Sequence, residues 1–203
     1  MGIRPISLIS AAAALSAVLI PGAFAQKTVT ATSGSASMSF SANMSNFLTP
    51  LGLSVGTVNP TSFSHNNTAT LTLATGVVDL DSGAVNLVYN GGFTIEGAGS
   101  TTIRFQNLTI DSTGKTPVMT AIVVVNNQVW GRYMLFDLTP PASMSLPFST
   151  HGVNWTLNGV QLALDPSASA LLNSIYGVSQ FSPGVNLATM NLSTKVSGDD
   201  WSY

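Results

Sequence analysis

The stretch from Val77 to Leu138 reads VVDLDSGAVNLVYNGGFTIEGAGSTTIRFQNLTIDSTGKTPVMTAIVVVNNQVWGRYMLFDL. Short runs of alternating apolar and polar residues are separated by turns made of Gly, Asn, Asp and Ser. Alternation with a period of two is typical of half-buried β-strands, because successive side chains point to opposite faces. Runs of this kind in direct succession, with no helix between them, predict an antiparallel β-meander.

The rest of the chain continues this pattern. Further strands are predicted at Leu53–Val58 and Val185–Val196, which gives roughly nine to eleven strands in all. One helix is expected after Asp165, which can cap it, with Pro166 in its first position and Gly177 just past its end. We therefore predict an all-β fold, an antiparallel β-sandwich with one short packed α-helix near the C-terminus.

Several local features follow from the turn residues. Asn90-Gly91 and Asn158-Gly159 each predict a tight hairpin, because both residue types tolerate a positive φ. Asn126-Asn127 predicts a third tight turn. Within Thr101–Asp111 the apolar residues change from odd to even positions, which predicts a β-bulge near Gln106-Asn107.

The N-terminus has the form of a secretory signal peptide. Arg4 precedes an apolar run from Ile6 to Ile20, and Ala23-Phe24-Ala25 is a small-residue cleavage site. We predict cleavage after Ala25, so that residues 1–25 are removed and residues 26–203 form a single secreted domain, extracellular or periplasmic. No second apolar run is long enough for a transmembrane helix.

The composition of the chain excludes several kinds of partner and metal site. Charged residues are 7% of the chain and there is no basic patch, so nucleic acid is not expected as a partner. The chain has no cysteine, which excludes disulfides and thiolate metal sites. A surface made polar by Ser, Thr and Asn suits contact with an extracellular polymer, a glycan or a surface protein. The oligomeric state is left open.

No catalytic pattern stands out. His65 and His151 lie among turn residues, and there is no G-x-S-x-G elbow. Glu96 and Asp111 are the pair that a glycosidase would need, but each sits beside a turn, where acidic residues commonly stabilise the turn itself. We therefore predict no enzyme activity, no metal site and no required cofactor.

Three segments carry a family resemblance. They are VNLVYNGG (85–92), TIRFQNLTID (102–111) and LLNSIYGVSQFSPG (171–184). Together they resemble secreted bacterial β domains of the HtaA type, the haem-uptake family, and their exported relatives of unassigned role. The resemblance implies a β fold, export and, in the haem-binding members, iron ligation by a Tyr near the start of the domain with an assisting His. No matching aromatic motif lies between Lys27 and Phe63, and Asn90 stands before Gly-Gly, where the family often has His.

The leading functional prediction is a non-enzymatic secreted or cell-envelope protein with a structural, adhesive or ligand-binding role. The first alternative is a haem-binding domain of the HtaA type, in which the phenolate of Tyr89 could ligate iron. The second alternative is a carbohydrate-active hydrolase. The predicted ligand-binding residues are Tyr89, Trp130 and Tyr133.

Overall fold

The computed structural model describes residues 28–64, 67–97, 101–142 and 154–196. The predicted signal peptide, His65 and His151 lie outside these residues. The elements are β1 (Thr28–Phe40), α1 (Ala42–Leu48), a 3-10 turn (Thr49–Leu51), β2 (Leu53–Val58), β3 (Ser62–Ser64), β4 (Thr68–Asp79), β5 (Val85–Asn90), β6 (Gly92–Gly97), β7 (Ile103–Asp111), β8 (Val118–Val125), β9 (Gln128–Thr139), β10 (Asn154–Leu164), α2 (Pro166–Tyr176) and β11 (Asn186–Val196).

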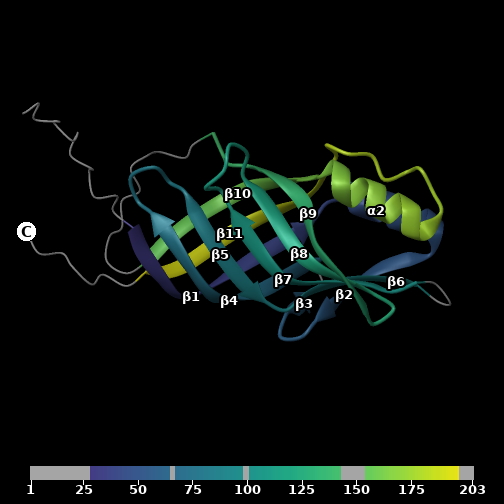
Figure 1. Cartoon of the computed structure of the whole chain (residues 1–203), viewed down its shortest axis with the longest axis horizontal. Coiled ribbons are helices and arrows are strands. Elements are labelled where there is room, and N and C mark those ends of the chain that lie inside the picture. Colours follow the sequence, from purple (N-terminus) through teal and green to yellow (C-terminus); the bar gives the residue numbers. More distant parts are fainter. Residues whose placement is uncertain (1–27, 65–66, 98–100, 143–153, 197–203) are drawn as a thin grey trace, which may run out of the picture.

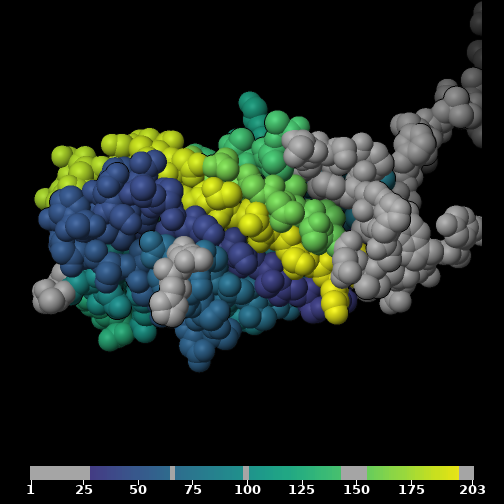
Figure 2. Space-filling model, turned by 180° about the vertical axis from the view of Figure 1, so that it is seen from behind, coloured from purple at the N-terminus to yellow at the C-terminus, as the bar shows by residue number. Residues whose placement is uncertain are grey.

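Eight of the strands form a closed antiparallel barrel (Figure 1). Around the ring they follow the order β7-β5-β4-β1-β11-β10-β9-β8, and pairing of β8 with β7 closes it. Seen from the other side, β1, β11 and β10 run next to one another as diagonal stripes of the barrel wall (Figure 2).

The all-β prediction is confirmed, but the predicted sandwich is wrong. Strands of a sandwich and of a barrel show the same alternation, so periodicity alone does not separate the two. Closure depends on non-local pairing: β1 pairs with β11 from the other end of the chain, and β7 pairs with β5 as well as with its sequence neighbour β6. Closing the ring also satisfies strand edges that would otherwise be exposed.

The first Asn-Gly pair does not form a hairpin. β5 and β6 do not pair with each other. They follow one after the other along the same edge of β7, and Gly91, with φ of 79°, forms the bend between them. The predicted bulge is confirmed, because the register between β7 and β8 shifts between Gln106 and Thr109, and Asn107 has a φ of 52°. On its other edge β6 pairs with β2, which lies beside the barrel.

The second Asn-Gly pair does not form a hairpin either, and it lies inside a strand. β10 is continuous through Asn158-Gly159, and its register against β11 shifts between Leu157 and Val160. Gly159 has a φ of 82°, and its N–H donates to Asn191 Oδ1 at 2.9 Å. Asn126-Asn127, in contrast, is the predicted tight turn, with both residues at positive φ between the paired strands β8 and β9.

Two helices cover one end of the barrel. α2 follows Asp165, whose carboxylate accepts from the Ser167 N–H at 2.6 Å, and it ends before Gly177 in the left-handed conformation. α1 was not predicted as a helix. Its N-terminus is held to the first residue of β11, because the hydroxyl of Ser41, directly before the helix, donates to the Asn186 carbonyl. The barrel interior beneath the helices is filled by buried apolar side chains.

Candidate functional site

The opposite end of the barrel, formed by turns, contains an apolar cavity of about 160 Å³. Near this cavity the described ladder between β9 and β10 is short, from Phe136 with Leu164 to Thr139 with Gln161. The earlier part of β10 pairs with β11. This turn-end cavity is lined by Ser82, Gly83, Ala84, Val85, Ile110, Ser112, Pro117, Leu138, Pro140, Trp155, Leu157, Val160, Met190 and Leu192.

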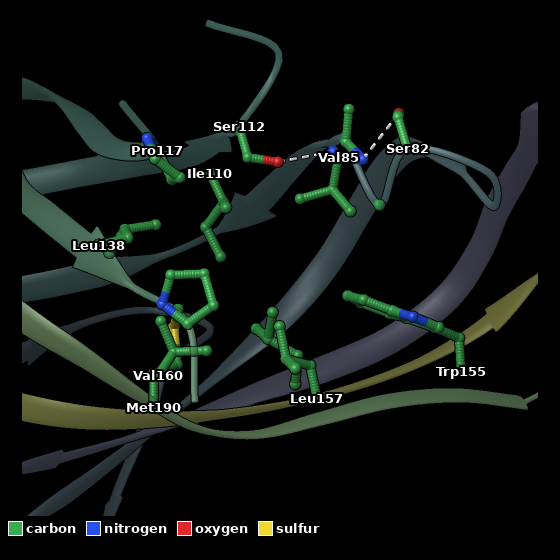
Figure 3. A pocket seen from close by; sticks show the side chains of 14 residues that line it. Ser82, Val85, Ile110, Ser112, Pro117, Leu138, Trp155, Leu157, Val160 and Met190 are labelled. Carbon is green, nitrogen blue, oxygen red and sulfur yellow. Dashed lines mark hydrogen bonds between the residues drawn. The ribbon is translucent and has the colours of Figure 1, made fainter. Parts of the chain in front are cut away.

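The walls of the turn-end cavity are almost wholly apolar. Trp155, only 3% exposed, and Leu157 face Val85 and Ile110 across the space (Figure 3). Strands β5, β7, β9, β10 and β11 all contribute side chains, so the cavity belongs to the barrel rather than to a single loop. Ligand sites are usually preformed concavities of this apolar kind with a few placed polar groups.

Two serines supply polar groups at the rim. Ser112 Oγ accepts from the Val85 N–H at 2.8 Å, and Ser82 Oγ accepts from the Ala84 N–H at 3.2 Å (Figure 3). Each serine oxygen therefore accepts a hydrogen bond from a backbone N–H, and the O–H of the same hydroxyl stays available as a donor.

A polar groove of about 520 Å³ adjoins the cavity on the outside of the same rim. The two spaces share Ser82, Ala84 and Ser112. The groove also borders Asp79, whose carboxylate accepts from the N–H groups of Asp81 and Ser82 and so stabilises the turn.

Tyr89 lies inside the barrel wall and is fully buried. It pairs with Leu73 on β4, and its hydroxyl lies near Thr194 on β11. Neither hydroxyl makes a hydrogen bond of normal geometry among the described residues. Burial raises the pKa of Tyr89 well above the ordinary value near 10, and the nearby Thr194 hydroxyl lowers it by less. Tyr89 is therefore a neutral phenol that does not border the turn-end cavity.

Replacing Tyr89 by Phe is expected to stabilise the fold by roughly 1 kcal/mol at neutral pH, since a buried hydroxyl without a partner costs about 1–3 kcal/mol. Because the pKa is raised in the folded state, the unfolded chain loses the Tyr89 proton first, and the stability of the wild type falls as the pH rises above 10. The variant should show a shallower loss above pH 10. Urea unfolding at pH 7 and pH 11 measures both effects.

Tyr133→Phe is the matched control, because the Tyr133 ring also packs on the core but is partly exposed. Its stability should change by less than about 0.5 kcal/mol. A clear loss of stability in Tyr89→Phe would show that its hydroxyl is hydrogen-bonded after all.

The three aromatic residues predicted to bind ligand are not brought together. Tyr89 is in β5, whereas Trp130 and Tyr133 are in β9, and β7 and β8 separate the two strands. Trp130 is 47% exposed on the outside, next to a register shift between β8 and β9. None of the three lines the turn-end cavity. Their role in binding stays a prediction.

Glu96 and Asp111, the pair considered for a glycosidase, lie at opposite ends of β7. Glu96 is in β6 beside the first half of β7, whereas Asp111 ends β7 opposite Asn86. The Thr113 hydroxyl and N–H donate to Asp111 and lower its pKa, as expected of a turn acid. Among the described residues, no three His, Cys, Asp or Glu side chains lie close enough to hold a metal ion.

The residues of the turn-end cavity were not identified from the sequence. Trp155 and Leu157 directly precede the Asn158-Gly159 pair, but which of their neighbours face a cavity depends on how β10 pairs with β9 and β11. Ser82 and Ser112 are in ordinary turn segments of a chain rich in Ser. The sequence offers one signal for this site, an apolar segment with a Trp that follows a stretch rich in Pro and Ser. This pattern is not specific for a binding cavity.

Comparison with known proteins connects the barrel to one group of solved structures. The C-terminal domain of HtaA from Corynebacterium glutamicum is similar with a TM-score of 0.63 and 19% identity, covering 83% of this chain and 99% of that domain. The N-terminal domain of HtaA has a TM-score of 0.56 and 13% identity, covering 83% and 99%. Heme binding protein HtaB from the same organism has a TM-score of 0.57 and 16% identity, covering 84% and 96%.

These likenesses confirm the resemblance to HtaA-type domains at the level of the fold. No family model matches the chain, and no curated protein matches it. No helix among the described residues is long and apolar enough to cross a membrane.

Proposed function

We propose that this chain is a non-enzymatic, exported domain that binds a small ligand inside its barrel. The observation that carries the proposal is the apolar turn-end cavity within a closed barrel. The similarity to HtaB, a haem-binding protein, favours ligand binding over a purely structural or adhesive role. Export rests on the predicted signal peptide of residues 1–25.

Haem is the candidate ligand that the similar structures favour, but neither Tyr89 nor Tyr176 is placed to ligate its iron. Iron ligation by Tyr needs an accessible phenolate. Tyr89 is buried and neutral. The Tyr176 hydroxyl donates to the carbonyl oxygens of Ile95 and Thr101, each at 3.2 Å. Burial and, to a smaller extent, the charge of Glu96 raise the pKa of Tyr176 to about 12.

The N-terminal part of the domain contains no residue better suited to ligate the haem iron. The segment 27–63, where HtaA-type haem binders carry their Tyr, contains neither Tyr nor His. The turn-end cavity of about 160 Å³ is also smaller than the range of about 300–1,000 Å³ usual for drug-sized ligands. We therefore propose a ligand smaller than haem, held without a metal bond.

Haemin added to residues 26–203 is expected to leave its absorbance spectrum unchanged, with no shift of the Soret band, because Tyr89 is buried, the Tyr176 hydroxyl lies at two backbone carbonyls and Tyr133 does not line the turn-end cavity. An absorbance titration with an HtaA domain as the positive control measures this. A saturable shift with one haemin per chain would overturn the proposal of a smaller ligand. Tyr133→Phe, His65→Ala and His151→Ala variants would then identify the axial ligand.

A further inference from the structure

We propose that the turn-end cavity binds a small uncharged amphiphile, with one aromatic ring or a short alkyl chain inside the barrel and a hydrogen-bond acceptor at the Ser82–Ser112 rim. This inference rests on the proposed function, since it names the ligand class of the same site. Three properties of the cavity support it: its volume, its lack of charge and the donors at its rim.

The volume sets the size of the apolar part. An apolar cavity of about 150 Å³ in another protein stays dry and binds benzene, and the turn-end cavity has about 160 Å³. Its deeper wall, from Ile110, Met190 and Leu192, is at most 2% exposed. A single ring or a chain of about six carbons matches this space, at roughly 25 cal/mol for each Å² of apolar surface removed from water.

The lining excludes a charged ligand from the interior. Its 14 residues include no Asp, Glu, Lys, Arg or His. A charge moved into such a space without a partner would lose its hydration, which costs several kcal/mol or more. The part of the ligand that enters the barrel is therefore uncharged.

The rim selects a head group that accepts hydrogen bonds. The oxygens of Ser82 and Ser112 already accept from backbone N–H groups, so each hydroxyl is left to donate. The groove outside the rim has room for a polar head and borders Asp79, and its described lining includes no cationic residue. An alcohol, ether or ketone fits this surface, whereas a carboxylate head would lie near the Asp79 carboxylate.

The first experiment compares probes on residues 26–203. Benzyl alcohol and 1-hexanol are titrated in ¹H–¹⁵N NMR spectra at pH 7, with toluene as the probe without a head and hexanoate as the charged probe. Both alcohols should shift signals of Val85, Ile110 and Trp155 saturably. Hexanoate should bind at least about tenfold more weakly, because its charge must lose hydration at the rim.

The second experiment uses variants. Leu157→Trp should fill the cavity and weaken benzyl alcohol at least about tenfold. Leu51→Trp is the control: it is also a half-buried leucine, but it lies at the helix end and outside the cavity. Ser82 is exposed, so Ser82→Ala should keep the fold, weaken benzyl alcohol about threefold and leave toluene unchanged.

The outcomes are separable. Absence of saturable binding by wild type overturns the inference but leaves the proposed binding function to other ligands. Equal binding by Leu157→Trp and wild type, or hexanoate binding as tightly as 1-hexanol, also overturns it. If Leu157→Trp does not fold, the Ser82→Ala comparison of benzyl alcohol with toluene still decides: equal weakening of both probes, or of neither, contradicts the rim contact. Haemin binding in the absorbance titration would change the proposed function. It would not overturn the alcohol site if the NMR titrations show saturable binding there.

Discussion

Gly92→Ala is expected to lower the free energy of unfolding by at least about 3 kcal/mol, in the upper part of the range for single substitutions. Gly92 starts β6 and pairs with Val58 on one side and Gln106 on the other. A Cβ atom at this position would lie 1.8 Å from the Phe105 carbonyl oxygen, which is backbone and cannot move alone. The substitution must therefore separate β6 from β7. Urea unfolding followed by circular dichroism measures the loss.

Gly114→Ala is the control for this prediction. Gly114 lies in the turn before β8, and a Cβ atom there would meet nothing within 4 Å. Its stability should stay within about 1 kcal/mol of wild type, with a small gain because the unfolded chain loses freedom. If the two variants unfold at the same urea concentration, β6 is not held against β7 as the structure has it.

Gly92 also shows why local sequence patterns predicted the strands better than their connections. Asn90-Gly91 was expected to reverse the chain, because Asn-Gly is the strongest short hairpin signal. The same positive φ equally suits a bend or a bulge within a continuing strand. The choice is made by β7, which pairs with both β5 and β6 and keeps them in one line. That partner follows Gly92 in the chain and is not visible to a local pattern.

The bulge at Gln106-Asn107 could be predicted because its cause is local. A change in the parity of apolar residues must be absorbed within the strand, or half of the side chains would face water. Barrel closure and the turn-end cavity have no such signature. Both depend on where pairing stops, as it does between β9 and β10 after four residue pairs. The cavity residues thus have ordinary strand and turn sequences.

Phe181→Ala is expected to destabilise the protein by about 3–5 kcal/mol, the range for removal of a buried Phe from a core. Phe181 is 1% exposed and joins the helices at their end of the barrel. Its ring centre lies 5.6 Å from that of Phe47 in α1 and 6.3 Å from that of Tyr176 in α2. The Ala variant loses both ring contacts and leaves a cavity between the helices. Chemical unfolding gives the size of the loss.

The backbone of Phe181 sharpens the interpretation of this variant. Its N–H donates to Asn173 Oδ1, and its carbonyl accepts from the Ser169 hydroxyl, so α2 holds the main chain in place without the ring. The lost stability therefore measures packing, and Phe181→Leu should recover part of it. Phe63→Ala is the control, because Phe63 is 39% exposed and its loss should cost less than about 1 kcal/mol. Equal losses in Phe181→Ala and Phe63→Ala would mean that the helices do not depend on this ring to cover the barrel end.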